Sequence, residues 1–452
     1  MDSLKNGHQA VLAELTARGV LTSVELQAAL KKSQPTVSRL LADLSARVLT
    51  LGRGRNTRYG AARAIMGRAP QQPLWWIDEA GTPRRIGTLS LLGDGSVVHV
   101  DGVDFEDTLR HRLPWYLAPL VPQGFLGRLL AQRLAASGLG ANPESWNLEA
   151  TLFAALHLHD APGAIVLGEP VAAAGSAGSS GQMQHLPAGA RRMGTALDGL
   201  AQDVARTLPA GSSAGGEQPK FLARLDNGAH VLVKFTPPRG TPFGERWHDL
   251  LHAEALAAEV LAERAVPVAA GRIVETAQRT YLLSPRFDRI GAAGRRHAVA
   301  VGAVHQAFVP GAYNHWAGTC EALVRQGRLD AAAGEQARAL LEFGRLIGNS
   351  DMHAGNLSLF TDLQSLAGAG ASTSQGWGRF SLAPVYDMLP MRWRPDPMLG
   401  GAADYTAFEP DAISTSGPAR APAALFWSRL SKQAAVDKAL RLVADEMTGR
   451  LA

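Results

Sequence analysis

Short amphipathic segments open the chain. Apolar residues at helical spacing predict a first helix over residues 4–18 and a second over residues 24–30, before the pair Lys31-Lys32. Ser33 can cap a third helix, with Pro35 in its first turn, where the missing N–H costs little. Three helices in about 45 residues indicate a small independent unit at this end of the chain.

The third predicted helix has an apolar face and a polar face. Its inner face carries Val37, Leu40, Leu41 and Leu44, and its outer face carries Gln34, Thr36, Ser38 and Arg39. A basic hairpin over residues 49–59 follows, with Arg53, Arg55 and Arg58. This order is typical of winged-helix DNA-binding domains, whose wing can reach phosphates or the minor groove. A small helical interaction domain with solvated charges is the alternative.

The pattern changes after residue 73. Short strands and turns are predicted up to about residue 160, with strands over 74–77, 87–92 and 97–100 and a helix over 124–134. A tract rich in Ala, Gly and Ser between residues 163 and 215 reads as a linker or a mobile loop. From residue 208 a loop, a hairpin, a helix and a strand precede a mainly helical half, an order that can hold a ligand between two lobes.

Composition and charge narrow the class of protein. The 452 residues are 46% hydrophobic and 19% charged, which excludes disorder throughout and favours two or three domains. The net charge is +5, but the first 70 residues carry +7 and the remainder −2, which favours a nucleic-acid-binding unit at one end. A single cysteine excludes an internal disulfide, and with no signal-peptide pattern or long apolar run we expect a cytoplasmic protein without membrane contact.

The first chemical signal is a loop of small residues, 211–220, whose backbone can approach a phosphate closely, although it lacks the Walker A sequence. Lys234 lies on the strand that returns from the following hairpin. Glu254 falls on the buried stripe of the helix predicted over about 246–263, and a buried carboxylate needs a cation. We therefore predict that Lys234 pairs with Glu254, as a lysine and a glutamate do near nucleotide phosphates in protein kinases.

A stronger signal lies in residues 348–358. Asp351 and Asn356 have the spacing of the kinase Asp-x-x-x-x-Asn loop, in which the Asp accepts the proton of the attacking hydroxyl and the Asn binds magnesium. Asp387 ends a short apolar run, where a second carboxylate can bind the metal. Each residue alone would be read as a turn cap or a strand end. The combined order of loop, Lys, Glu, Asp-x-His-x-x-Asn and Asp favours phosphoryl transfer.

With these motifs in this order, the sequence resembles the HipA family, the kinase toxins of bacterial toxin–antitoxin systems, and specifically its YjjJ branch with an N-terminal helix-turn-helix. The resemblance covers residue 87 to the C-terminus, and the catalytic-loop pattern is also similar to that of phosphoinositide-kinase-like enzymes. It implies an α+β chain in which a winged helix-turn-helix precedes a two-lobed HipA/phosphoinositide-kinase-like kinase fold. The expected units are residues 1–66 for DNA binding, 67–205 for a HipA-like N-terminal subdomain with the linker, and 206–452 for the kinase core.

The resemblance also implies ATP and Mg²⁺ as cofactors and a role for each matched residue. Asp351 resembles the catalytic base and Lys234 the phosphate-contacting lysine. His353 resembles a structural or phosphate-proximal member of the catalytic loop, and the alternative is a hydrogen-bonded histidine in the core. The implied magnesium ligands are Asn356 and Asp387, although an insertion over residues 367–378 separates Asp387 from the catalytic loop.

Other matched residues surround the expected nucleotide. They are Ser213, Gly215, Gly216, Lys220, Lys234, Glu254, Asn356 and, at the adenine, Arg286 and Phe287. Ser213, with Ser212 beside it, falls at the loop serine that family members autophosphorylate, a modification expected to eject the loop and switch the enzyme off.

The main hypothesis is therefore an ATP-dependent serine/threonine protein kinase that also binds duplex DNA, for autoregulation or self-neutralisation. The resemblance implies a translation factor or a tRNA synthetase as the protein substrate. The alternative is a DNA-binding regulator whose kinase-like body binds nucleotide without transferring phosphate. A zinc site at His248 and His252 is not expected, because Asp249 replaces the Glu of His-Glu-x-x-His and the sequence indicates no third ligand.

Overall fold

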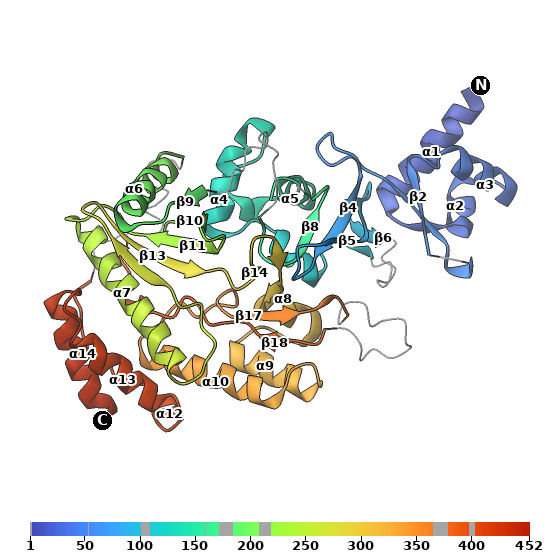
Figure 1. Ribbon diagram of the computed structural model, residues 1–452. Helices are drawn as coiled ribbons and strands as arrows, with labels where there is room; N and C mark the ends of the chain where they lie inside the picture. The colour runs from blue at the N-terminus through green and yellow to red at the C-terminus, as the bar shows by residue number, and fades with distance from the viewer. Residues whose placement is uncertain are drawn as a thin grey trace.

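The chain folds into three consecutive α+β units, shown in a computed structural model (Figure 1). The structure describes residues 2–52, 54–100, 109–158, 160–170, 184–207, 218–364, 378–396 and 403–452. None of the helices within these ranges combines the length and the apolar character that crossing a bilayer requires.

The first unit contains three helices and a small sheet. These are α1 (Asp2–Arg18), α2 (Ser23–Leu30), α3 (Gln34–Asp43) and strands β1 (Leu21–Thr22), β2 (Val48–Leu51) and β3 (Arg58–Ala61), in the sheet order β1-β3-β2. Thr22 caps α2 and forms a capping box with Glu25. The predicted inner face of α3 is buried, with Val37 and Leu40 in the same core as Val11 and Leu15 of α1.

The second unit is built on an antiparallel sheet with the order β7-β6-β5-β4-β8. Its strands are β4 (Gln71–Ile77), β5 (Pro83–Leu91), β6 (Val97–Val100), β7 (Leu109–Arg110) and β8 (Ile165–Leu167), and its helices include α4 (Gly124–Arg133) and α5 (Leu148–Ala155). Leu51 of the first unit packs on Leu92 and Val98 of this one. The predicted strands and the predicted helix of this region are present.

The third unit begins with a sheet of order β12-β13-β11-β10-β9. Its strands are β9 (Gln184–Leu186), β10 (Lys220–Leu225), β11 (His230–Phe235), β12 (Arg272–Glu275) and β13 (Thr280–Pro285). Helices α6 (Ala190–Thr207) and α7 (Pro242–Ala262) cover its opposite faces, as Figure 1 shows. Leu283 packs towards α6 and the adjacent Leu282 towards α7, because successive side chains of a strand alternate.

The rest of the third unit is mainly helical. It combines a sheet of order β16-β17-β18 with helices packed in an extended core. The strands are β16 (His297–Ala300), β17 (Ser358–Thr361) and β18 (Ser381–Leu382), the longer helices are α8 (Val301–Phe308), α9 (Trp316–Arg325), α10 (Ala331–Leu346), α13 (Arg420–Leu430) and α14 (Lys438–Leu451), and a two-stranded ribbon pairs β14 (Arg289–Ile290) with β15 (Gly294–Arg295).

Part of the tract read from sequence as a linker or mobile loop is regular structure. Between residues 163 and 215 the chain forms β8, β9 and α6, while residues 171–183 and 208–217 lie outside the described residues. Strand β9 pairs with β10 in parallel, so residues 184–207 are part of the third unit's sheet. The small residues hid this arrangement because α6 needs only one narrow apolar stripe, formed by Met193, Leu197 and Ala201.

The second and third units meet at a buried histidine. Nδ1 of His297, on β16, accepts a hydrogen bond from the Ala164 N–H at 3.1 Å, and its Nε2–H donates to the Tyr116 carbonyl at 3.0 Å. These two bonds require the neutral ring with its proton on Nε2. Burial lowers the pKa of His297 to about 4, outweighing the opposing effects of the Tyr116 bond and of Asp288.

This histidine predicts a loss of stability in mild acid. In the unfolded chain its pKa is near 6.5, so below that pH the unfolded state binds more protons than the folded state. We expect this one group to lower the free energy of unfolding by about 2 kcal/mol as the pH falls from about 7.5 to about 5. Denaturant unfolding across this range should show a flatter pH profile for His297→Gln than for the wild type. Parallel profiles would contradict the assignment.

Candidate functional site

A buried lysine joins three distant parts of the third unit. Nζ of Lys234 on β11 donates to both carboxylate oxygens of Glu254 on α7, at 2.6 and 2.8 Å, and to Oδ1 of Asp387. Lys234 is 5% and Glu254 8% exposed. The predicted pairing of Lys234 with Glu254 is therefore confirmed, and Asp387 joins it from the segment after β18.

The neighbouring charges in this cluster keep Lys234 protonated and Asp387 ionised. Burial disfavours the charged form of Lys234, but the two carboxylates outweigh it and raise its pKa. Burial likewise raises the pKa of Asp387, but the positive charges of Lys234 and Lys220 outweigh it and bring the pKa down to about 2. Lys220 lies opposite Lys234 in the β10–β11 register. Asp387 is therefore ionised at neutral pH, as a metal ligand must be.

Asn349, which the sequence reasoning missed, connects the catalytic loop to Asp387. Its Nδ2 donates to the Asp387 carbonyl at 3.2 Å, and its Oδ1 accepts from the Asp351 N–H at 3.0 Å. Asn356 in turn donates from Nδ2 to the Asp351 carbonyl at 2.7 Å. Asn349 is only 5% exposed. Its place directly after Gly348, where α10 has ended, and two positions before Asp351 was the signal available for it.

Asp387 adopts a backbone conformation that needs support. Its φ is +57°, in the left-handed region that non-glycine residues rarely occupy and that costs about 1 kcal/mol or more. The Asn349 bond holds its carbonyl and Lys234 holds its carboxylate. The preceding Tyr386 donates its hydroxyl hydrogen to the Gly355 carbonyl at 2.6 Å. Several independent contacts thus hold the Asp387 side chain in one direction.

His353 lies at the surface of the catalytic loop. Its Nδ1 accepts from the Gly355 N–H at 2.9 Å, and its carbonyl accepts from Nε1 of Trp316 at 2.9 Å. The side chain is exposed, so the interpretation as a buried core histidine is wrong. Its charge contributes to the low pKa of Asp387, after the effects of burial and the two lysines. It therefore stands beside the charged cluster.

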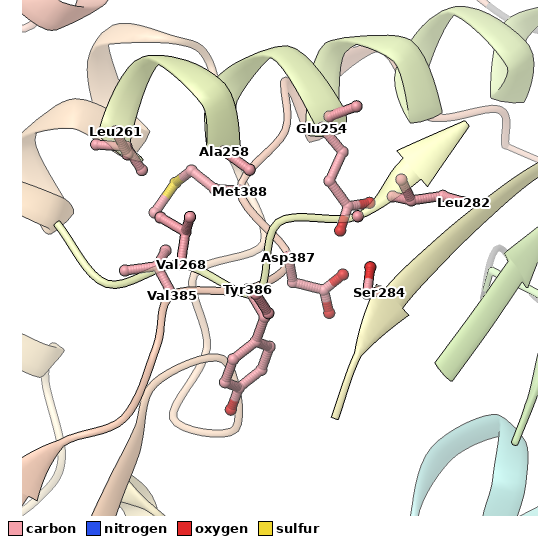
Figure 2. Close-up of a pocket in the computed structure, with 13 residues that line it drawn as sticks. Glu254, Ala258, Leu261, Val268, Leu282, Ser284, Val385, Tyr386, Asp387 and Met388 are labelled. Carbon is pink, nitrogen blue, oxygen red and sulfur yellow. The ribbon is translucent and has the colours of Figure 1, made fainter. Parts of the chain in front are cut away.

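A small pocket adjoins this cluster. Its walls come from α7, β13, the connection between α7 and β12, and the segment containing Asp387, as Figure 2 shows. The lining is mostly apolar and includes Ala258, Leu261, Val268, Leu282, Val385 and Met388. Glu254 and Asp387 bring carboxylates to one side of it, and Ser284 brings a hydroxyl. The pocket therefore combines an apolar wall with two carboxylates and a hydroxyl at one side.

Arg286 and Phe287, expected at the adenine, do not line the pocket. The Arg286 guanidinium is buried in ion pairs with Asp160 and Asp288. Phe287 stacks on Tyr386, with ring centroids 5.6 Å apart and planes at 30°. Phe287 therefore lies behind the pocket residue Tyr386, and the expectation that backbone groups of this segment meet adenine stays a prediction.

Four expected site residues of the small-residue loop, Ser212, Ser213, Gly215 and Gly216, lie outside the described residues, as does Arg53 of the expected wing. In the first unit, Gln34, Ser38 and Arg39 are exposed on α3, Thr36 is half-buried, and Arg55 and Arg58 are exposed around the β2–β3 turn. The polar face expected to contact DNA is therefore accessible.

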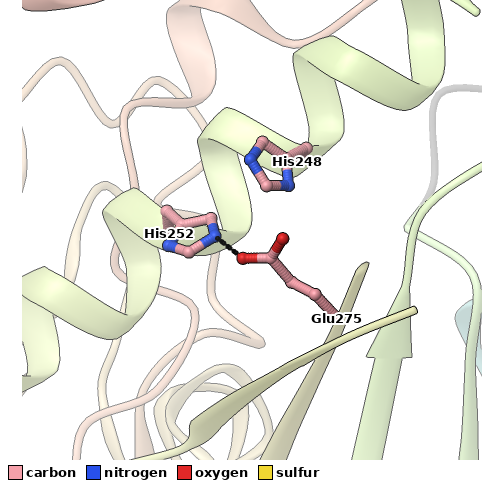
Figure 3. Close-up of side chains that lie close together, drawn as sticks. All are labelled: His248, His252 and Glu275. Carbon is pink, nitrogen blue, oxygen red and sulfur yellow. Dashed lines mark hydrogen bonds and ion pairs between the residues drawn. The ribbon is translucent and has the colours of Figure 1, made fainter. Parts of the chain in front are cut away.

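Two histidines on α7 gain a third potential ligand in the structure. Nε2 of His252 lies 3.1 Å from Oε1 of Glu275 on β12, and ligand atoms of both and of His248 lie within 4.8 Å of one another (Figure 3). The expectation that no third ligand exists is thus wrong. However, Nη1 of Arg239 lies 2.6 Å from Nδ1 of His248, and Nε2 of His248 bonds to the Ala435 carbonyl. A guanidinium inside the cluster opposes a divalent cation.

Comparison with known proteins decides the family. A model of the HipA-like C-terminal domain matches residues 212–451, and a model of the YjjJ-like toxin middle domain matches residues 68–175. The toxin YjjJ of Escherichia coli strain K12 is 34% identical over an alignment 454 residues long, which covers 97% of this chain and 97% of that protein. The chain belongs to the HipA family, in its YjjJ branch.

The fold of this HipA-family chain is also that of a solved relative. A chain in the complex of the toxin–antitoxin proteins HipA and HipB with operator DNA, from Shewanella oneidensis MR-1, superposes with a TM-score of 0.54 at 16% identity. The match covers 84% of the present chain and 95% of the other. The second and third units therefore correspond to the middle domain and the HipA-like C-terminal domain of the family, and these names are used below.

The role of Asn349 can be tested through stability. Asn349→Ala leaves the Asp387 carbonyl and the Asp351 N–H without their shared partner, so we expect the free energy of unfolding to fall by about 1–3 kcal/mol. Denaturant titration measures it. Asn314→Ala, at an exposed position, is the control and should leave the midpoint unchanged. Equal midpoints for the two variants would show that the bridge contributes nothing.

Proposed function

We propose that this HipA-family protein is an ATP- and Mg²⁺-dependent serine/threonine protein kinase. One observation carries the proposal: Lys234, Glu254 and Asp387 meet at one point, and Asn349 ties that point to the catalytic loop of Asp351. These groups come from positions more than 150 residues apart in the chain. The family membership supports the same reading.

Each residue of the site has its own role in phosphoryl transfer. Asp351 orients a substrate hydroxyl and accepts its proton while the hydroxyl oxygen bonds to the γ-phosphorus and the bond to the β,γ-bridging oxygen breaks. Lys234 and Lys220 face the phosphates. The Asp387 carboxylate and the amide oxygen of Asn356, whose nitrogen is engaged by the Asp351 carbonyl, form an oxygen donor set of the kind that magnesium prefers. When bound, the metal neutralises charge on the phosphates.

The kinase proposal predicts that Asp351→Asn lowers phosphate transfer from ATP to protein about 10²- to 10⁴-fold, because the general base is lost. Transfer of the γ-phosphate label and mass spectrometry of the loop containing Ser212 and Ser213 measure this. Asp445→Asn, exposed on α14, is the matched control and should transfer label at the wild-type rate. A wild type that binds ATP without transferring label would support the nucleotide-binding regulator instead.

We further propose that the first unit is a winged helix-turn-helix that binds duplex DNA. The supporting observations are its helix and strand order, the exposed polar face of α3 and the exposed arginines near the β2–β3 turn. The HipA-family neighbour was solved with an antitoxin and operator DNA. In the present chain, a DNA-binding unit in the same polypeptide would couple the kinase to its own operator.

The DNA proposal predicts a salt-dependent affinity that rests on Arg39, Arg55 and Arg58. Replacing all three by Ala in the full-length chain should weaken binding to duplex DNA and reduce the slope of log affinity against log salt by about 2–3, since each phosphate contact releases about one counterion. Fluorescence anisotropy at several salt concentrations measures the slope. Arg325→Ala, exposed on α9, should bind as the wild type does. An unchanged slope in the triple variant would refute this surface.

A further inference from the structure

A buried ion-pair network crosses from the middle domain into the C-terminal domain. Oδ2 of Asp160, in the segment between α5 and β8, lies 2.6 Å from Nη1 of Arg286, and its Oδ1 lies 2.7 Å from Nη2 of Arg289. Asp288 accepts from the same two arginines, at 2.8 and 2.7 Å, and from the Gly163 N–H at 2.9 Å. The arginine side chains are 7% and 4% exposed. Both domains therefore supply charge to one buried cluster.

Asp160 is needed to balance this cluster. Two guanidinium groups, those of Arg286 and Arg289, pair with two carboxylates, those of Asp160 and Asp288. Burial and the neighbouring Arg289 lower the pKa of Arg295, which lies nearby, to about 9. Without the Asp160 charge, Arg286 and Arg289 would share the single carboxylate of Asp288. Buried charges that lose their partner are strongly unfavourable, so the arginines would have to move.

The arginines cannot move without moving the nucleotide pocket. Arg286 directly follows β13, whose Ser284 lines the pocket, and its N–H donates to the His230 carbonyl at the start of β11 at 2.9 Å. Phe287 lies between the two charged residues and stacks on the pocket residue Tyr386. The network is thus attached to the wall of the pocket through Arg286, which follows β13, and through Phe287, which contacts Tyr386.

We propose that Asp160 of the middle domain is a positioning residue for the nucleotide pocket of the C-terminal domain. This proposal rests on the proposed function, because it takes the pocket as the binding site of the ATP that the proposed kinase uses. Asp160 does not touch the pocket itself; it fixes Arg286 and Arg289, and through them the end of β13 and the ring behind Tyr386. The middle domain is then part of the kinase site, and the C-terminal domain alone lacks one of the groups that shape it.

The test separates positioning from a general loss of stability. In the full-length chain, Asp160→Asn should raise the KM for ATP and the Kd of a non-hydrolysable ATP analogue about tenfold or more, because a small displacement of a pocket wall weakens binding sharply. The kcat at saturating ATP should change less than the KM, since the network reaches the catalytic loop indirectly, through Phe287, Tyr386 and the Gly355 carbonyl. A purely structural role would lower the folded fraction, which reduces kcat and leaves KM unchanged.

Glu149→Gln is the matched control. Glu149 is also a middle-domain carboxylate that pairs with an arginine of a neighbouring unit, Arg63, but it lies at the other junction. Its variant should keep the wild-type KM. If Asp160→Asn does not fold, Arg289→Lys replaces it, because it keeps the positive charge while losing bonds of the guanidinium fork, and the same rise in KM and Kd is expected.

The outcomes are distinguishable from a failure of the kinase proposal. A KM and a Kd within about twofold of the wild type in the folded variant would overturn the role of Asp160. A wild type that binds the analogue without transferring phosphate would refute the kinase, and the Kd comparison would still decide whether Asp160 positions the pocket.

Discussion

The structure of the site depends on one ammonium group held between two carboxylates. A buried ion pair of this kind is weak evidence for stability, because removing the charges from water costs about as much as their attraction returns. Lys234 instead brings three parts of the chain together, because it binds α7 and the segment after β18 to β11 at one point. The three charges sum to −1, and the nearby Lys220 brings a further positive charge beside Asp387. The two carboxylates are therefore balanced by two lysines at this point.

Local periodicity explains how much of this was predictable. Glu254 was singled out because helical spacing put a carboxylate on a buried stripe, and the strand residue Lys234 was the natural candidate for its partner. Asp351 and Asn356 were singled out by their kinase-like spacing together with the order of the other motifs. The predicted inner face of α3 and the strands of the middle domain are equally local features, each determined by a period of 3.6 or 2 residues. Such patterns can be recognised in the sequence without any knowledge of long-range contacts.

The contacts that could not be predicted from the sequence join residues far apart in the chain, or they involve residues beyond the end of a regular helix or strand. Asp160 and Arg286 stand 126 residues apart, and no spacing rule connects them. Arg286 was assigned to the adenine site by its resemblance to a motif, and nothing in the sequence indicated that its side chain pairs with Asp160 and Asp288 beyond the end of β13 at Pro285. The parallel pairing of β9 with β10 was missed for the same reason, because parallel partners need not be neighbours in sequence.

The two junctions of the middle domain share a structural element. Glu149 lies in the first turn of α5 and binds Arg63 and the Met66 N–H of the chain leaving the first unit, while Asp160 follows the end of α5 and binds the C-terminal domain. The helix and the segment after it therefore carry a carboxylate to each neighbour. The apolar residues Leu152 and Phe153 of α5 pack in the extended core that also includes residues of the C-terminal domain. The first unit and the C-terminal domain thus both contact the middle domain in or just after α5.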